Sequence, residues 1–247
     1  MKIDVLTLFP EMFQPIISSS ILGRAVEKKI VEIRLTDIRD FSNDKHNKAD
    51  DYPYGGGGGM VMLADPIFGA LEAIGAEGKK IAYMSPRGKI LNQEKLDEMA
   101  CLDDLVILCG HYEGVDQRVL DYWNMEEISI GDYVLTGGEL PAMVLIDSLV
   151  RLLPNVLGNV DSALNESVYS GLLEHSQYTK PRIYRGMEVP EVLVSGNHKL
   201  IELWKFREAL LLTKERRPDL FDAFMKKDGE FSREQAEIIE EIVKIQT

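Results

Sequence analysis

The fold is decided by the stretch Ile128-Ser129-Ile130-Gly131-Asp132-Tyr133-Val134-Leu135-Thr136-Gly137-Gly138-Glu139-Leu140-Pro141-Ala142. Residues 127–130 are rich in β-branched side chains and predict a strand. Residues 131–138 contain three glycines and predict a loop. From Glu139 onward, apolar residues recur at helical spacing, and Pro141 falls in the first turn, where its missing N–H costs nothing. The stretch therefore predicts a strand, a glycine loop and a helix.

The glycines of this loop let the backbone approach a ligand with no side chain in the way. A plain strand-to-helix connection is the competing interpretation. The G-x-G-x-x-G order of a dinucleotide fingerprint is absent, and no G-K-[ST] follows as in a Walker loop.

Two other predicted strands, 80–85 and 105–109, also end in loops that contain glycine or proline, at 85–88 and 110–114. In open parallel sheets, ligands bind beyond the carboxyl ends of the strands. Three such loops would form one pocket with many backbone groups and few charges, which suits a neutral or zwitterionic ligand with an apolar base. A polyphosphate would require a lysine, and only Arg87 is near.

The rest of the chain predicts a parallel sheet followed by helices. Residues 2–9 and 31–35 predict strands around a helix at 13–29, a βαβ unit. Residues 36–59 are polar and end in five glycines, Gly55–Gly59, which predict either a backbone nest for an anion or a flexible linker. After a loop-like boundary at 154–165, helices are expected at 200–213, at 218–226 and from 232 to the end of the chain.

Composition excludes several classes of protein. The 247 residues are 45% hydrophobic and carry a formal net charge of −13, which argues against binding nucleic acid by bulk attraction. No apolar run is as long as a transmembrane helix, and the N-terminus has no signal-peptide pattern. Cys101 and Cys109 lack metal-type spacing and fit a reducing cytosol, so we expect a cytoplasmic protein with no metal site and no membrane partner.

The charge is uneven along the chain. Residues 175–217 carry nine basic and five acidic side chains. This local excess is compatible with a specific nucleic-acid partner, and equally with a solvated helical surface.

Six motifs, in order and over essentially the whole chain, resemble one family, the bacterial tRNA (guanine-N1)-methyltransferases called TrmD. Each motif alone is weak, but the ordered set is highly specific. The motifs are Leu6-Thr7-Leu8-Phe9-Pro10, Asp51-Tyr52-Pro53-Tyr54-Gly55-Gly56-Gly57, Ser85-Pro86-Arg87-Gly88, Cys109-Gly110-His111-Tyr112-Glu113-Gly114, Gly131 to Pro141 and Ser195-Gly196-Asn197-His198.

The resemblance implies an α/β fold of the SPOUT type, with a parallel sheet and a deep trefoil knot, plus a smaller, mostly helical C-terminal domain. Pattern alone would not predict the knot, because threaded chains are nearly absent among proteins. The expected domains are residues 1–160 with the S-adenosylmethionine site, an interdomain linker at 161–170, and a tRNA-binding domain at 171–247.

The resemblance also implies a homodimer that methylates N1 of the guanosine 3′ of the anticodon, tRNA position 37, with S-adenosylmethionine as methyl donor. Mg²⁺ can assist in this family, but the sequence has no dedicated ligand cluster for it. The family's catalytic aspartate is Glu166 here, which keeps the carboxylate. His111 and Gln177 stand where arginine and histidine are common, and no proline follows Gly57-Gly58-Gly59.

The site residues follow from the resemblance. Glu166 is the implied base for the N1 proton, and Arg151 stabilises charge that moves toward O6. From the residues alone, Arg151 is more simply a helix C-terminal cation and Glu166 a solvated acid. The implied donor-binding residues are Ser85, Pro86, Gly110, Glu113, Gly114, Ile130, Gly131, Asp132, Tyr133, Val134, Leu135, Gly137, Gly138 and Pro141. The implied substrate-binding residues are Asp50, Gly56, Gly57, Asn197 and His198.

Three alternatives remain at this stage. The chain could be a SPOUT enzyme that methylates another RNA position, or a non-catalytic RNA-binding protein with a vestigial pocket. An acid at 166 together with Arg151 argues against the second. A dinucleotide-binding α/β enzyme is disfavoured because the fingerprint is missing.

Overall fold

The computed structural model describes residues 1–157, 171–226 and 231–244. The chain divides into two compact units, Met1–Gly158 and Asn159–Thr247, and each is described by itself below. Within the described ranges, no helix combines the length and the apolar character needed to cross a lipid bilayer.

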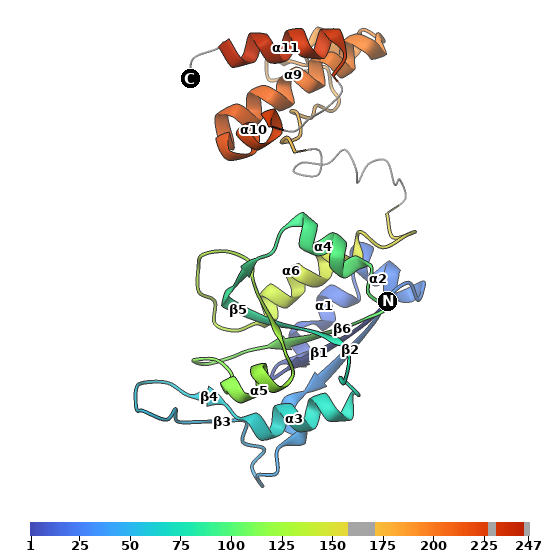
Figure 1. Ribbon diagram of the computed structural model, residues 1–247. Helices are drawn as coiled ribbons and strands as arrows, with labels where there is room; N and C mark the ends of the chain where they lie inside the picture. Colours follow the sequence, from blue (N-terminus) through green and yellow to red (C-terminus); the bar gives the residue numbers. More distant parts are fainter. Residues whose placement is uncertain (158–170, 227–230, 245–247) are drawn as a thin grey trace. The chain divides into compact units, whose positions relative to one another are not determined.

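A five-stranded parallel sheet forms the centre of the first unit (Figure 1). Its order is β2-β1-β6-β5-β7, so the chain crosses over repeatedly between neighbouring strands. This confirms the predicted parallel sheet. The strands are β1 (Lys2–Thr7), β2 (Glu32–Asp37), β5 (Lys80–Ile90), β6 (Asp104–Cys109) and β7 (Glu126–Ser129).

Helices cover both faces of this sheet, which is why its central strands read as continuous apolar runs. In β6, Leu105 and Ile107 enter one core, whereas Val106 and Leu108 enter the other. The first core is closed by α1 (Gln14–Ile17), α2 (Ser20–Glu27), α4 (Gln93–Ala100) and α6 (Glu139–Val150). The second is closed by η2 (Ile38–Phe41), α3 (Ala64–Ala73) and α5 (Gln117–Tyr122).

The single helix predicted at 13–29 is wrong, because the chain breaks it between α1 and α2. Ser20 adopts a left-handed φ of 56°, which no continuous helix allows. Gly23 then packs against the backbone of Ser18, and a Cβ on Gly23 would lie 2.6 Å from the carbonyl carbon. A 3₁₀ turn, η1 (Pro10–Met12), precedes α1.

Strand β5 does not end at Ser85, as the sequence suggested, but continues to Ile90 through a bulge. Met84 and Lys89 both pair with Ile128 of β7, so residues 85–88 are looped out of the ladder. Gly88 makes this possible, because a Cβ there would lie 2.4 Å from the backbone C of Glu127 and N of Ile128. The bulge leaves Ser85 to Arg87 outside the β5–β7 ladder.

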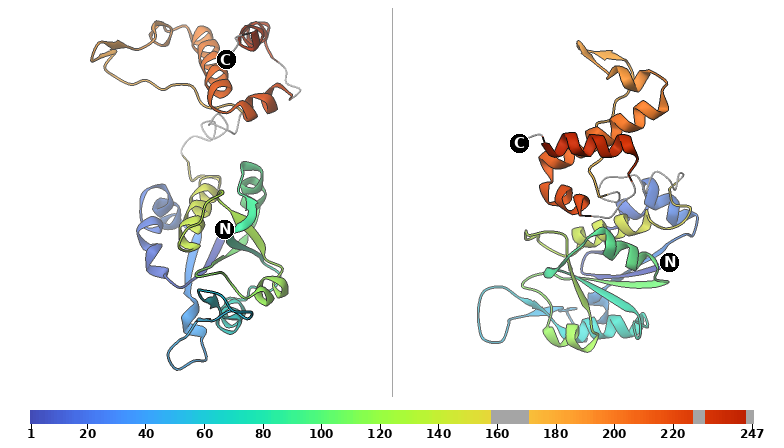
Figure 2. Two further views of the ribbon diagram at one scale, coloured as in Figure 1. Left: turned by 90° about the vertical axis from the view of Figure 1, so that its left-hand side faces the viewer. Right: turned by 45° about the horizontal axis from the view of Figure 1, so that its top comes forward.

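A small antiparallel pair, β3 (Asp50–Asp51) and β4 (Val61–Met62), brackets the glycine run. The second unit is built around α9 (His198–Arg216), against which α10 (Pro218–Met225) and α11 (Arg233–Lys244) pack (Figure 2). Its core comprises Leu172, Leu210, Phe221, Phe224 and Ile242. A two-stranded hairpin of β8 (Ile183–Tyr184) and β9 (Met187–Glu188), then α8 (Glu191–Val194), precedes α9.

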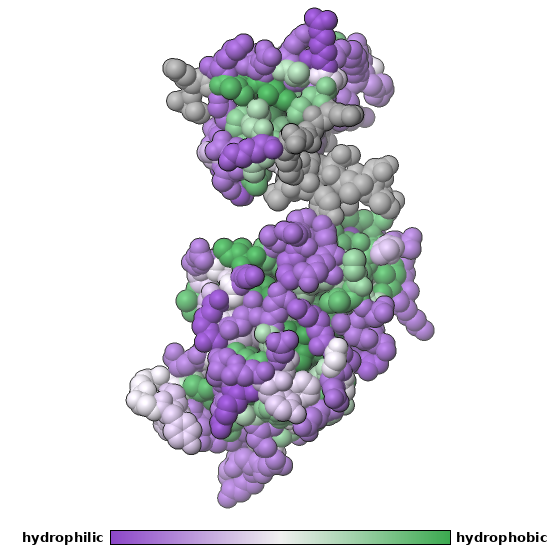
Figure 3. All heavy atoms as spheres, in the orientation of Figure 1, coloured by the Kyte–Doolittle hydropathy of each residue, from purple (hydrophilic) through white to green (hydrophobic). Residues whose placement is uncertain are grey.

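Hydrophilic residues cover much of both units on the face shown in Figure 3, with apolar residues gathered in smaller patches. This agrees with the strongly charged composition, 28% of the chain.

We expect Gly88→Ala to lower the free energy of unfolding by about 1–3 kcal/mol, because the added methyl group must push β5 and β7 apart. Thermal and urea unfolding would measure the loss. Gly58→Ala is the matched control, since a Cβ there meets nothing within 4 Å. Equal stability of the two variants would contradict the close approach at Gly88.

Candidate functional site

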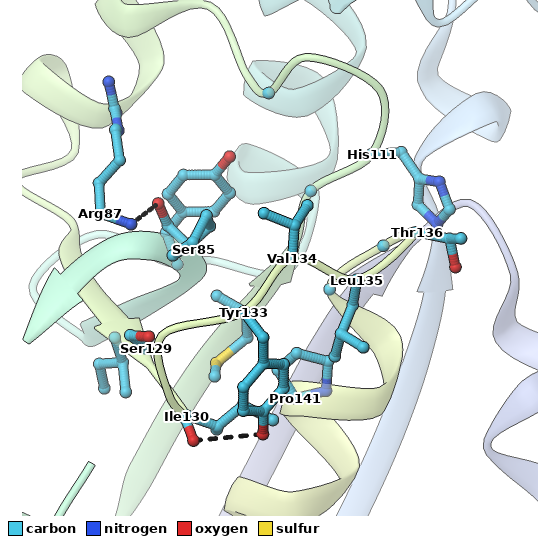
Figure 4. Close-up of a pocket in the computed structure, with 18 of the residues that line it drawn as sticks. Ser85, Arg87, His111, Ser129, Ile130, Tyr133, Val134, Leu135, Thr136 and Pro141 are labelled. Atoms are coloured by element: carbon cyan, nitrogen blue, oxygen red, sulfur yellow. Dashed lines mark hydrogen bonds between the residues drawn. The ribbon is translucent and has the colours of Figure 1, made fainter. Parts of the chain in front are cut away.

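A cavity of about 270 Å³ lies beside the bulge in β5 and at the carboxyl ends of β6 and β7 (Figure 4). The bulge at 85–87, the loop at 110–114 and the loop at 130–138 all line it, so the structure brings the three predicted loops together. The lining residues are Tyr83, Met84, Ser85, Pro86, Arg87, Gly110, His111, Tyr112, Glu113, Gly114, Ile128, Ser129, Ile130, Gly131, Tyr133, Val134, Leu135, Thr136, Gly137, Gly138 and Pro141.

Two of these loops are joined backbone to backbone. The Gly138 N–H donates to the Gly110 carbonyl at 2.8 Å, and His111 pairs with Gly137 in an isolated antiparallel bridge. A Cβ on Gly138 would lie 2.8 Å from the Cα of Cys109 and from the N of Gly110. A side chain at 138 would therefore separate the loops.

A buried carboxylate ties the same loops to β1. Glu139, only 1% exposed, accepts a hydrogen bond from the Thr7 hydroxyl at 2.6 Å through Oε1. Its Oε2 lies 2.7 Å from Nε2 of His111. Glu139 opens α6, where the helix dipole favours a negative charge, and Phe9 packs beside the His111 ring at 4.8 Å between centroids. These contacts fix the His111 side of the pocket.

The turn after β7 is held by local hydrogen bonds. The Gly131 N–H donates to the Ser129 hydroxyl, and that hydroxyl donates to the Gly131 carbonyl at 3.0 Å. The Tyr133 hydroxyl donates to the carbonyl of Ile130 at 3.3 Å (Figure 4). A Cβ on Gly131, whose φ is 149°, would lie 2.5 Å from the Tyr133 ring.

The pocket offers little free positive charge. The Arg87 guanidinium forms a two-pronged pair with the Glu127 carboxylate, with both N···O distances 3.1 Å. Burial, and then the Glu127 charge, raise the pKa of the Tyr83 phenol, which therefore stays neutral at physiological pH. The walls include Ile130, Leu135 and Pro141. Such a pocket suits a ligand with an apolar base and no polyphosphate.

The loop before β4 packs beside this pocket. The Glu113 N–H donates to the Met60 carbonyl and the Met62 N–H to the Gly114 carbonyl, both at 2.9 Å. Burial, and then the neighbouring Asp50 carboxylate, raise the pKa of the Tyr112 phenol. Asp50 therefore lies next to the pocket loop at 110–114.

The pocket lining does not include Gly56, Gly57 or Asp132. Gly56 and Gly57 are exposed, with left-handed φ values of 78° and 126°. Asp132 is exposed and does not line the pocket. In the second unit, Asn197 caps α9, its side-chain oxygen accepting from the Leu200 N–H, and His198 is exposed.

The two predicted catalytic residues are placed differently. Arg151 follows α6 directly, at the end opposite the pocket. Because α6 has twelve residues, helix geometry separates its two ends by about 18 Å. Glu166 lies outside the described residues.

The donor-binding set predicted from the sequence leaves out eight of the lining residues: Tyr83, Met84, Arg87, His111, Tyr112, Ile128, Ser129 and Thr136. Tyr83, Met84, Ile128 and Ser129 belong to strands, where apolar or β-prone residues indicate a core position. The available signal for the other four was their place inside the three predicted loops.

Comparison with known proteins decides the family. A family model described as tRNA (Guanine-1)-methyltransferase TrmD matches residues 1–223. A tRNA (guanine-N(1)-)-methyltransferase of Ruminiclostridium cellulolyticum is 54% identical over 92% of this chain and 99% of the relative. One from Geobacillus kaustophilus is 54% identical over 91% and 93%, and one from Bacillus cereus 50% identical over the full length of both chains.

The chain belongs to the TrmD family. Membership in this methyltransferase family implies S-adenosylmethionine as methyl donor, and the pocket fits that molecule. The glycines at 110 and 138 let the pocket loops close on their neighbours, since a Cβ on Gly110 would lie 2.7 Å from the Tyr83 side chain and one on Gly138 would lie 2.8 Å from the Cys109 Cα. The neighbouring walls, which include Ile130, Leu135 and Pro141, are apolar.

We expect Gly138→Ala to abolish or strongly weaken S-adenosylmethionine binding, because the added methyl group collides with the backbone of Cys109 and Gly110. Isothermal titration calorimetry would measure the affinity. Gly58→Ala, far less constrained, should bind as wild type does. An unchanged affinity in Gly138→Ala would show that the close contact between Gly138 and the Cys109–Gly110 backbone is not needed for donor binding.

Proposed function

We propose that this chain methylates N1 of the guanosine 3′ of the anticodon in tRNA, with S-adenosylmethionine as donor. The observation that carries the proposal is the pocket, in which three loops present bare backbone and apolar walls, on a chain of the TrmD family. The donor-binding residues predicted from the sequence are assigned to this pocket, apart from Asp132, which does not line it.

Two side chains complete the chemistry. When bound, S-adenosylmethionine supplies a methyl group on a sulfonium centre. Guanine N1 carries a proton at neutral pH, and the Glu166 carboxylate accepts it as the base. The Arg151 guanidinium stabilises negative charge that moves toward O6 of the guanine. Asp50 contacts the guanine, a role supported by its position beside Tyr112 of the pocket loop.

The length of α6 supports a homodimer with shared sites. Arg151 and the pocket stand at opposite ends of this helix, about 18 Å apart, too far for one arginine side chain to span. A second copy related by a two-fold axis can present its own Arg151 to the pocket. The exposed apolar residues Leu140 and Val144 of α6 offer a surface for that copy.

The remaining features of the family belong to the same proposal. The pocket loops form the SPOUT-type trefoil knot, residues 171–247 bind tRNA, and the enzyme works in the cytoplasm. The contact between Gly110 and Gly138 supports the knot, since it joins two loops that close around the end of β6.

The proposal is tested by transfer of a labelled methyl group to unmodified tRNA transcripts. We expect label at N1 when guanosine follows the anticodon, and none when adenosine replaces it. Glu166→Gln should keep its donor affinity and react about 100-fold or more slowly in single turnover. Label at another nucleotide would favour a SPOUT enzyme that methylates a different RNA position. A wild-type rate in Glu166→Gln would show that Glu166 is not the base that accepts the N1 proton.

Shared sites are tested by mixing two inactive variants. Gly138→Val destroys the pocket but keeps Arg151, whereas Arg151→Gln keeps the pocket. Random re-association should give about half mixed dimers, each with one intact site, and hence about a quarter of the wild-type rate.

The matching control mixes Gly138→Val with the double variant Gly138→Val/Arg151→Gln, which can form no intact site. If the first mixture is as inactive as the control, Arg151 acts within its own protomer or not at all.

A further inference from the structure

The hairpin segment, residues 178–189, is exposed along almost its whole length. Every residue from 176 to 188 is exposed, including Ile183, Tyr184 and Met187. Its ladder is short, with Ile183 opposite Glu188 and Tyr184 opposite Met187. A two-stranded hairpin without a covered face is marginal in water, so an exposed apolar surface here indicates a binding surface.

The hairpin segment is nevertheless held in place. The Val189 N–H donates to the Arg182 carbonyl at 3.0 Å, which extends the ladder by one bond. The Tyr178 ring lies 6.3 Å from the Trp204 ring of α9, and His175 packs on the same indole at 6.0 Å. Trp204 is half-buried and is not part of the core of the unit. Its contact with Tyr178 instead attaches the hairpin segment to α9.

The ion pairs separate the basic side chains into two groups. On the helices, carboxylates hold four of the nine basic residues between 175 and 217: Lys199, Lys205, Arg207 and Arg217. Lys214 donates to the carbonyl of Ile242, and Arg216 stands at the end of α9. Lys180, Arg182 and Arg185 of the hairpin segment form no ion pair within the described ranges.

Charge that is not neutralised internally is available to an anionic partner. Three cations without an ion pair in the described part of the chain lie on one exposed ribbon. Basic residues of this kind bind phosphates and release the counterions that the phosphates held. The remainder of the chain is acidic, so these cations mark a local contact rather than general attraction.

The hairpin segment also carries an exposed aromatic platform. The Arg185 guanidinium lies over the Tyr184 ring at 5.4 Å, and the residue Tyr184 is 56% exposed. Unstacked RNA bases bind aromatic rings and arginine planes of this kind.

We propose that the hairpin segment is an RNA-contact surface: Lys180, Arg182 and Arg185 bind the ribose-phosphate backbone, and Tyr184 stacks on an unpaired base. This inference rests on the proposed function, in which the RNA is tRNA. It identifies the hairpin segment as the part of the second unit that contacts the tRNA.

The test compares two triple variants in the full-length protein. The hairpin triple carries Lys180→Gln, Arg182→Gln and Arg185→Gln. The helix triple carries Lys205→Gln, Arg207→Gln and Arg217→Gln. It also removes two arginines and one lysine, but at positions where each is paired with a carboxylate. Both triples change the net charge equally, so any difference between them reports position alone.

Binding of an unmodified tRNA transcript is measured by fluorescence anisotropy at several salt concentrations. We expect the hairpin triple to bind at least about tenfold more weakly at low salt, and its plot of log affinity against log salt to be shallower by about 2. The helix triple should stay within about twofold of wild type. Calorimetry should give the wild-type affinity for S-adenosylmethionine in both triples.

Stacking is tested separately. Tyr184→Ala should weaken tRNA binding about tenfold without changing the salt dependence, and Tyr184→Phe should restore it.

Two results would contradict the proposal that the hairpin segment binds RNA. One is an equal loss of tRNA affinity in both triples, which would mean that the affinity depends on the net charge of the protein and not on the hairpin segment. The other is a hairpin triple that shifts from dimer to monomer in sedimentation, which would mean that a second copy covers the hairpin segment. Wild-type protein that fails to methylate tRNA would instead contradict the proposed function.

Discussion

The first unit depends on one close approach of two backbone segments, where the Gly138 N–H meets the Gly110 carbonyl. Because neither segment has a Cβ at this point, the last turn before α6 can lie directly on the end of β6. That placement sets where α6 begins, and it turns Glu139 inward toward Thr7 and His111. The buried carboxyl group then makes the arrangement cooperative, since losing Thr7 or His111 would leave one of its buried oxygens without this hydrogen-bond partner.

Much of the fold could be predicted from local sequence. The apolar run of β6 and the glycine loops after β6 and β7 signal their structures through turn chemistry and periodicity alone. The bulge in β5 could not be predicted, because it arises where Met84 and Lys89 both pair with Ile128 of β7, a strand distant in the sequence. The hairpin of β8 and β9 was missed because two-residue strands with exposed side chains show no alternation between buried and exposed positions.

The sequence predicted the part of the site that lies in loops, but not the part that lies in strands. Glycine and proline residues mark loops, so the sequence located most of the pocket lining. Strand residues such as Tyr83 and Ile128 were missed because a residue that lines a pocket from a strand has the same pattern as a core residue. Asp132, which the resemblance implies as a donor-binding residue, is exposed and does not line the pocket. Arg151 and Glu166 rest on family resemblance, since local sequence does not specify which segments a second copy would bring together.

The span of α6 has a consequence for how the enzyme is switched on in a cell. In the proposed dimer, a lone subunit keeps a complete pocket for the sulfonium donor but lacks the guanidinium that the reaction needs. The catalytic activity then depends on the concentration of subunits, and newly synthesised monomers are inactive until they dimerise. Dimerisation therefore prevents methyl transfer by unassembled subunits.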